Sequence, residues 1–214
     1  MFKLDLDGSN VDEAKDWLKD MDVVFAKPSK GVRGKGVTRL QVEDVEETIN
    51  YCLNNNLDLL EEAIIQHKDM NSLYPDAINT VRFMTFVENK EVKIIGTRLR
   101  MGNGGHVDNA PAGGLFATID VDSGEIDSIA FNKSGEKFEK HPITNHPIEG
   151  FKIPYWEEVI EMCKKAALEV PDVRSIGWDV AISENGPLLI EGNDRWCRVL
   201  WQLPTEQGLY HLIK

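Results

Sequence analysis

Residues 176–193, which read IGWDVAISENGPLLIEGN, contain two short apolar runs that each carry one acid. In the first run every second residue is large and apolar, and this alternation predicts a β-strand. The large residues of one face are Ile176, Trp178, Val180 and Ile182. The other face carries Gly177, Asp179 and Ala181. The acid therefore stands among small side chains, which leave room for a ligand.

The second run predicts a return strand that follows a turn at Ser183 to Pro187. Asn-Gly favours a tight turn, and proline cannot donate a hydrogen bond to a β-ladder. Leu189, Glu191 and Asn193 are then expected to share one face of the return strand. A turn of this length also places Asp179 directly opposite Glu191.

Two carboxylates that face each other across a hairpin repel, unless a positive charge lies between them. A divalent cation held by Asp179, Glu191 and the amide oxygen of Asn193 would supply that charge. Mg²⁺ suits such a site because it takes few protein carboxylates and completes its octahedron with water and phosphate oxygens. The alternative is an edge hairpin whose acids are simply solvated.

A glycine-rich stretch, PSKGVRGKG at 28–36, joins the predicted strand Val23 to Lys27 to a second predicted strand, Val37 to Leu40. A Walker loop joins a strand to a helix and ends in Gly-Lys-Ser/Thr, so this stretch is not one. Its free backbone N–H groups and its cations can instead close over a polyphosphate, with Lys27 as a fixed positive charge. The alternative is a basic surface hairpin.

Two further stretches suggest ligand contacts. The strand LDLLEEAIIQH ends in acids followed by apolar residues, which suits an adenine ring and its ribose, although an ordinary core strand fits as well. Strands are also predicted at Asn79 to Val87 and Glu91 to Met101, and alternation puts Arg98 and Arg100 on one face, where Arg82 can join them. These arginines indicate a phosphate or carboxylate site, or surface pairs with the many acids.

The remaining elements are expected to be mostly helices. Amphipathic spacing predicts helices from Ser9 to about Asp20, from Val42 to Asn55, from Pro154 onwards and from about Thr205. The segment GNGGHVDNAPAGG, at 102–114, has almost nothing to bury. Its glycines are better explained by backbone that approaches a ligand or moves.

Composition narrows the classes of partner. The formal net charge of −12 argues against nucleic acid and against anionic membranes, because phosphate-rich partners need a basic surface. The three cysteines are widely spaced and form neither a disulfide framework nor a zinc set, which indicates a reducing cytoplasm. No apolar run approaches the roughly 20 residues of a membrane span, and the N-terminus lacks a signal-peptide core.

The order of these parts resembles the ATP-grasp superfamily. The stretches GWDVAI, GPLLIEGN, NTVRF and GGHVDNAPAGG are most similar to its sugar-transfer-associated branch. The resemblance implies an α+β fold in which two lobes of mostly antiparallel sheet, with packed helices, grip a nucleotide. The small lobe would be 1–66 with a glycine-rich lid, and the large lobe 67–214 with the magnesium and phosphate site.

The resemblance also implies roles for particular residues. Lys27 would contact the nucleotide phosphates, and Ser29 to Gly36 would form the lid. The lid residues that bind the nucleotide would be Ser29, Gly31, Gly34 and Gly36, and the adenine would meet Glu62, Ala63, Ile64 and Ile65. Asp179, Glu191 and Asn193 would hold one or two Mg²⁺ ions, with Mn²⁺ as the alternative metal.

The chain departs from the family pattern in two places. ATP-grasp proteins usually begin with a further domain, which is not recognisable in residues 1–22, so we expect a piece of a longer protein, or a partner chain or second copy that completes it. Some members carry a phosphoryl-stabilising arginine just before the metal-binding Asp, where this chain has Gly177 and Trp178. The expected replacement is Arg100 first, with Arg98 and Arg195 as the other candidates.

The implied activity is that of an ATP- and Mg²⁺-dependent carboxylate–amine ligase that works through an acyl phosphate. Its substrates would be a small-molecule carboxylate and an amine, and the branch suggests a sugar or amino-acid conjugate of surface polysaccharide synthesis. The alternatives are a kinase of the same fold that phosphorylates a hydroxyl, and a nucleotide-binding lobe without catalysis.

Overall fold

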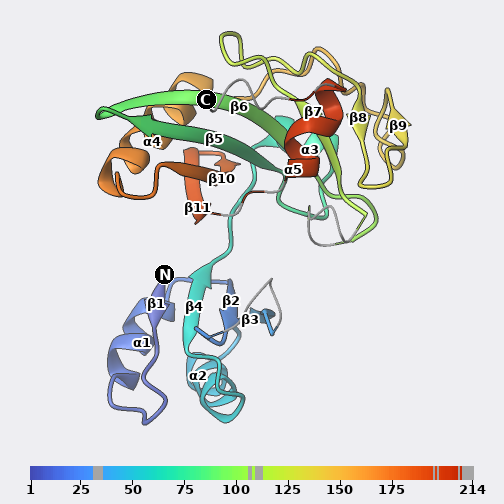
Figure 1. Ribbon diagram of the computed structural model, residues 1–214. Coiled ribbons are helices and arrows are strands. Elements are labelled where there is room, and N and C mark those ends of the chain that lie inside the picture. The colour runs from blue at the N-terminus through green and yellow to red at the C-terminus, as the bar shows by residue number, and fades with distance from the viewer. Residues whose placement is uncertain are drawn as a thin grey trace. The chain divides into compact units, whose positions relative to one another are not determined.

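The computed structural model describes residues 1–30, 36–105, 108, 113–194, 196, 198–206 and 208. The chain forms two compact units, Met1–Ile64 and Ile65–Lys214 (Figure 1). Its helices are α1 (Val11–Leu18), α2 (Val45–Asn54), α3 (Lys68–Leu73), α4 (Trp156–Glu169) and α5 (Arg198–Gln202), which a 3-10 turn at Leu203–Thr205 follows. Its strands are β1 (Phe2–Lys3), β2 (Val23–Lys27), β3 (Thr38–Gln41), β4 (Leu59–Glu62), β5 (Thr80–Glu88), β6 (Glu91–Met101), β7 (Leu115–Thr118), β8 (Ala130–Phe131), β9 (Lys137–Phe138), β10 (Ser175–Ser183) and β11 (Gly186–Asn193).

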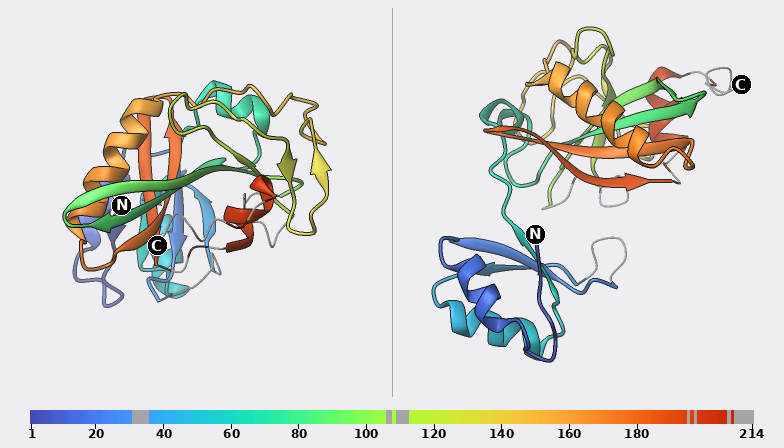
Figure 2. Two further views of the ribbon diagram at one scale, coloured as in Figure 1. Left: turned by 45° about the horizontal axis from the view of Figure 1, so that its top comes forward. Right: turned by 90° about the vertical axis from the view of Figure 1, so that its left-hand side faces the viewer.

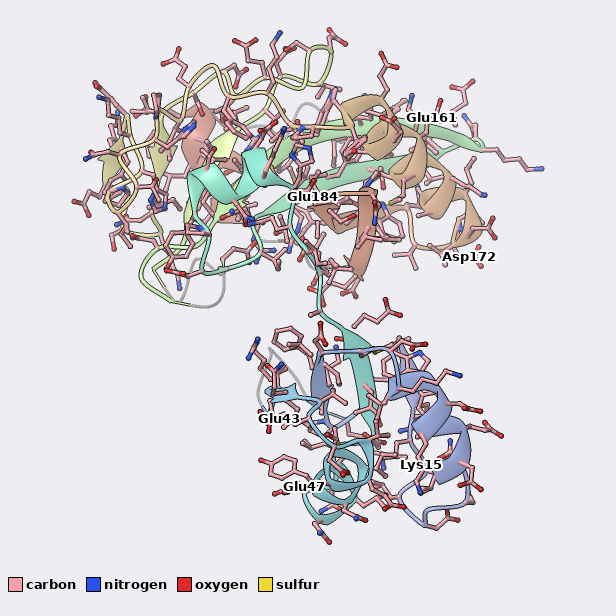
Figure 3. All side chains as sticks on the ribbon, turned by 180° about the vertical axis from the view of Figure 1, so that it is seen from behind. Lys15, Glu43, Glu47, Glu161, Asp172 and Glu184 are labelled. Carbon is pink, nitrogen blue, oxygen red and sulfur yellow. The ribbon has the colours of Figure 1, made fainter. Side chains whose placement is uncertain are left out.

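The first unit is a four-stranded antiparallel sheet, in the order β1-β4-β2-β3, with α1 and α2 packed on it. Its core contains fully buried side chains from the strands and from both helices, among them Leu18, Val24 and Leu60. The carboxylate of Asp44 caps α2 by accepting a hydrogen bond from the backbone N–H of Glu47 at 2.8 Å. Figure 3 shows the charged side chains of Lys15, Glu43 and Glu47 around these helices.

The second unit is built on a seven-stranded sheet in the order β11-β10-β5-β6-β7-β8-β9. Helix α4 covers one face of this sheet (Figure 2). Alternation along β5 sends Val81 and Phe83 into the core on the α4 side, whereas Thr80 and Arg82 belong to the opposite face. That opposite face, which we call the site face, carries the polar side chains considered below.

An aromatic cluster covers part of the site face. Trp201 of α5 packs with Met84 and Ile95, and its indole N–H donates to the carbonyl of Ile95 at 3.1 Å. Trp196 meets the Trp201 ring edge to face, with ring centroids 4.6 Å apart. The chain after β11 is thereby fastened to the sheet.

The hairpin of β10 and β11 differs from its prediction in two ways. The turn is only Glu184 and Asn185, because Ser183 already pairs with Gly186, so the predicted turn from Ser183 to Pro187 is wrong. A bulge at Ile190 then adds one residue to β11. The two differences cancel, and Asp179 does pair with Glu191.

The bulge also changes which residues share a face. Leu189 pairs with Val180, whose side chain belongs to the core face, whereas Glu191 and Asn193 pair with Asp179 and Gly177 of the site face. The prediction that Leu189 shares a face with Glu191 is therefore wrong, whereas the prediction that Asn193 shares a face with Glu191 is confirmed.

Other predicted elements had mixed outcomes. The strands β2 and β6 have their predicted bounds. Helices α3 and α5 were not predicted, and the helix expected from about Thr205 falls largely on residues outside the described part of the chain. Among the helices of the described residues, none has the length and the apolar character that a membrane span requires.

Candidate functional site

The site face carries a row of charged side chains that runs across four neighbouring strands. Strand register pairs Glu191 with Asp179, Asp179 with Arg82, and Arg82 with Arg98. Directly paired residues of adjacent strands point to the same face. Two acids from the hairpin therefore stand beside the arginines of the β5–β6 pair.

Asp179 accepts hydrogen bonds from two arginines. Arg82 binds it in a bidentate manner, through Nε to Oδ1 and through Nη2 to Oδ2 at 2.8 Å, and Arg100 Nη1 donates to Oδ2 at 2.7 Å. Burial alone would raise the pKa of Asp179, but the hydrogen bonds and charges of Arg82 and Arg100 hold it below its ordinary value. This buried carboxylate is therefore ionised at neutral pH.

Arg100 bridges Asp179 to a second buried acid, Asp108. Its Nη2 donates to Asp108 Oδ1 at 2.7 Å, while Asp108 Oδ2 accepts from the backbone N–H of Thr80 at 3.2 Å and from the Thr80 hydroxyl. Burial raises the pKa of Asp108, although the charge of Arg100 opposes the shift. Sequence reasoning missed Asp108, and its only signal was that it is the one acid in the glycine-rich segment 102–114.

Arg82 reaches Asp179 by passing Gly177. A Cβ atom on Gly177 would lie 3.0 Å from Cδ of Arg82 and 2.8 Å from Cβ of Trp196. Glycine therefore leaves the space through which the arginine crosses. In the sequence, Arg82 stands out only as a single charge within the apolar run of β5.

Glu191 and Asn193 complete the hairpin part of the site. Glu191 is exposed, and Asn193 Nδ2 donates to Glu191 Oε1 at 3.1 Å and to the carbonyl of Gly177 at 3.4 Å, which leaves the amide oxygen for a cation. The described residues contain no group of three or more His, Cys, Asp or Glu side chains placed for a metal. Asp179 Oδ1 accepts a hydrogen bond from Arg82, and Oδ2 accepts one from Arg82 and one from Arg100, so Asp179 could add to Glu191 and the Asn193 amide oxygen only through the remaining lone pair of Oδ1. Such a set would leave most of the octahedron of a Mg²⁺ ion to water and phosphate oxygens.

Arg98 lies on the same face as Arg100 but makes different contacts. Its Nη2 donates to the carbonyl of Trp201, and its Nη1 donates to the carbonyl of Thr97 at 2.6 Å, while Nε has no hydrogen-bond partner in the described structure. Burial lowers the pKa of Arg98 to about 10, although the charge of Asp127 raises it. The guanidinium thus supports the last turn of α5.

We therefore expect Arg98→Met to act on stability and not on ligand binding. The replacement removes two buried hydrogen bonds to carbonyls and should lower the free energy of unfolding by about 1–3 kcal/mol. The affinity for MgATP should stay within about twofold of wild type. Urea unfolding and calorimetric titration measure the two effects, and a large loss of affinity in a folded Arg98→Met protein would contradict this assignment.

In the first unit, the predicted phosphate-binding lysine ends β2. Lys27 Nζ forms an ion pair with Glu61 Oε2 at 2.8 Å, and both side chains are about one-third exposed. The residues predicted to meet adenine begin at the end of β4. Glu62, the last residue of β4, is exposed, and Ile65 is 74% exposed. Ala63 and Ile64 between them are partly exposed.

Three predicted site residues, Gly31, Gly34 and Arg195, lie outside the described residues. The two ends of the glycine-rich stretch are described. Gly36 adopts a left-handed conformation with φ of +82°, and the backbone N–H of Ser29 donates to the carboxylate of Asp58.

Solved structures of nucleotide-bound enzymes share this architecture. A biotin carboxylase from Campylobacter jejuni, solved as a β-γ-ATP complex, aligns with a TM-score of 0.55 and 12% identity over 94% of this chain and 37% of its own. The biotin carboxylase domain of a 2-oxoglutarate carboxylase from Hydrogenobacter thermophilus, solved with MgADP, ADP and bicarbonate, aligns with a TM-score of 0.51 and 17% identity over 92% and 35%. An N5-carboxyaminoimidazole ribonucleotide synthetase, solved with ADP, aligns with a TM-score of 0.51 and 13% identity over 91% of this chain and 39% of its own. The fold is therefore the α+β ATP-grasp fold.

Residues 4–214 match the family model described as sugar-transfer associated ATP-grasp, and the chain belongs to that family. The chain spans little more than a third of the length of the three solved structures named above. No curated protein sequence matches it.

Proposed function

We propose that this chain carries the nucleotide-binding core of an ATP- and Mg²⁺-dependent ligase that joins a carboxylate to an amine through an acyl phosphate. The observation that carries the proposal is the pairing of Asp179 with Glu191 beside the arginines Arg82 and Arg100. Acids for a cation and arginines for an anion are thus brought to one place on the sheet. Phosphoryl transfer needs this combination of charges.

Within each unit, particular residues are assigned a role in nucleotide binding. Lys27 binds phosphate, and the stretch Glu62, Ala63, Ile64 and Ile65 receives the adenine and ribose. Asp179, Glu191 and Asn193 would hold the Mg²⁺ ion, with Mn²⁺ as an alternative. Both oxygens of Asp179 accept hydrogen bonds from arginine, so its bond to the ion would use a remaining lone pair. When bound, the ion neutralises charge on the phosphate oxygens.

Arg82 and Arg100 are the residues that we assign to the transferring phosphoryl group. Each is less than one-tenth exposed, and Asp179 holds both guanidinium groups in place. A guanidinium that is already oriented stabilises an anion with little further ordering. Arg100 remains our first candidate, now together with Arg82, while Arg98 is held by the Trp201 carbonyl.

The reaction then needs no side-chain nucleophile. An oxygen of the substrate carboxylate attacks the γ-phosphorus in line, and the bond to the bridging oxygen of ADP breaks. The amine next attacks the acyl carbon of the acyl phosphate, loses a proton to solvent, and releases inorganic phosphate. The chain's residues position and neutralise the reacting groups, which accounts for most of the catalysis in this chemistry.

The relatives support the class of substrate only in general terms. The named structures are a synthetase, a biotin carboxylase and a biotin carboxylase domain, solved with adenine nucleotides. The family description links this branch to sugar transfer. We therefore propose a sugar or amino-acid conjugate of surface polysaccharide synthesis as the product, and the cytoplasm as the location.

An isotope experiment tests the ligase mechanism in the full-length protein. Carboxylates labelled with ¹⁸O are incubated with MgATP and a panel of amines, and the released phosphate is analysed by mass spectrometry. A ligase transfers one ¹⁸O atom from the carboxylate to phosphate. ADP formation that requires a hydroxyl acceptor and gives unlabelled phosphoryl product would indicate a kinase instead. Tight MgATP binding without turnover on either panel would indicate a binding lobe.

A further inference from the structure

Ser29 lies two residues after Lys27, where a nucleotide-binding loop would offer its donors to phosphate. In this structure both donors are already used. The backbone N–H of Ser29 donates to Asp58 Oδ1 at 2.6 Å, and its hydroxyl donates to Asp58 Oδ2 at 2.8 Å. Lys3 Nζ completes the cluster by donating to Ser29 Oγ at 3.0 Å and by pairing with Asp58.

Asp58 is well placed to hold the end of β2. It immediately precedes β4, and Leu59 of that strand pairs with Lys27, the last residue of β2. Asp58 is 9% exposed, and its own carbonyl accepts from the backbone N–H of Leu4 at 2.8 Å. Its backbone is therefore fixed by its neighbours, so that its carboxylate can fix Ser29.

The carboxylate of Asp58 is charged at neutral pH. Burial acts to raise its pKa, but the hydrogen bonds from Lys3 and Ser29 outweigh burial and lower the pKa to about 2. Hydrogen bonds to an ionised acceptor are stronger than those between neutral groups. Two such bonds from a single residue restrict Ser29 more than an ordinary turn contact would.

Gly36, at the other end of the glycine-rich stretch, lies close to Pro28, the residue before Ser29. A Cβ atom on Gly36 would lie 3.2 Å from Cδ of Pro28, so the two chain ends meet beside the residue that Asp58 holds. Ser29 is thus held by hydrogen bonds, and Gly36 lies close to Pro28.

We infer that Ser29 and Asp58 form an anchor and not a phosphate site, and that Asp58 is a positioning residue for the neighbouring Lys27 and the start of the glycine-rich stretch. The effect on nucleotide affinity rests on the proposed function above. An anchored strand end loses less conformational freedom when the ligand binds, which strengthens binding without a direct contact.

Calorimetric titration of MgATP into Asp58→Ala, Ser29→Ala and Asp44→Ala proteins tests the inference. Asp44→Ala is the matched control, because it removes an acid that binds a backbone N–H in the same unit but does not contact Ser29. We expect about tenfold weaker binding for Asp58→Ala, corresponding to about 1.4 kcal/mol. Ser29→Ala keeps the backbone bond and should lose about threefold, and Asp44→Ala should match wild type.

A different ranking would overturn the inference. If Ser29 contacts phosphate directly, Ser29→Ala will weaken binding as much as Asp58→Ala or more. If Asp58 serves stability alone, Asp58→Ala and Asp44→Ala will both lower the thermal midpoint and leave the affinity of the folded protein unchanged.

Trypsin supplies a readout that needs no nucleotide. The glycine-rich stretch contains cleavage sites after Lys30, Arg33 and Lys35. We expect native Asp58→Ala protein to be cut there about tenfold faster than wild type and Asp44→Ala, with the fragments identified by mass spectrometry. Equal rates would refute the anchor. Wild-type protein that fails to bind MgATP, while Asp58→Ala is still cut faster, would refute the proposed function and leave the anchor standing.

Discussion

Replacing Asp179 with alanine should lower the free energy of unfolding of the full chain by about 3–5 kcal/mol at pH 7. The change removes the carboxylate that accepts hydrogen bonds from Nε and Nη2 of Arg82 and from Nη1 of Arg100, all within a buried part of the sheet face. A buried guanidinium that loses its carboxylate retains its charge and pays the cost of desolvation. Urea unfolding, followed by tryptophan fluorescence, measures the loss.

A double variant separates the structural effect of Asp179 from its proposed part in nucleotide binding. In the Arg82→Met, Asp179→Leu protein both charges are replaced by apolar side chains of similar size, and most of the lost stability should return. MgATP binding should not return, because the cation ligand and one phosphate-binding arginine are both absent. A double variant that binds MgATP like wild type would contradict the site assignment, and one as unstable as Asp179→Ala would contradict the ion-pair explanation.

Gly177→Ala should be a damaging change, although it adds only a single methyl group to the site. The added Cβ would approach Trp196 Cβ to 2.8 Å and Arg82 Cδ to 3.0 Å, so that the arginine must move away from Asp179. Overpacking of this kind costs about 1–3 kcal/mol of stability. We also expect MgATP affinity to fall about tenfold, a loss of about 1.4 kcal/mol.

Gly105→Ala is the matched control for Gly177→Ala. A Cβ atom on Gly105 would meet nothing within 4 Å, and its backbone is not left-handed. Its stability and affinity should therefore remain close to wild type. If Gly177→Ala behaves like Gly105→Ala in both measurements, Arg82 does not need the space that Gly177 leaves.

The facing acids were predictable from the sequence because alternation is a strong signal in a buried strand. Every second residue of β10, from Ile176 to Ile182, packs in the apolar core, and this sets Asp179 on the other face. The bulge at Ile190 was not predictable, since the run Leu188 to Ile190 is apolar throughout and conceals a change of period. The correct partner for Asp179 came from two errors of opposite sign.

The orientation of the long side chains was beyond prediction. Arg98 and Arg100 are two residues apart and share a face, yet one guanidinium meets the carbonyl of Trp201, 103 residues away, and the other meets Asp179. Alternation determines the face of a residue but not the direction of a flexible chain, which depends on distant partners. For the same reason Asp58 gave no signal, because its role depends on contacts to Lys3 and Ser29 from other parts of the unit.

The central claim is that the hairpin acids bind the nucleotide's magnesium, and the dependence of ATP affinity on Mg²⁺ tests it most directly. ATP is titrated into wild-type and Glu191→Gln protein, each with excess Mg²⁺ and with EDTA. Glu191 is exposed, so its replacement should leave the thermal midpoint unchanged. We predict that Mg²⁺ strengthens ATP binding at least tenfold in wild type and less than twofold in Glu191→Gln. Equal affinities with and without Mg²⁺ in wild type, or an undiminished effect of Mg²⁺ in the variant, would contradict the claim.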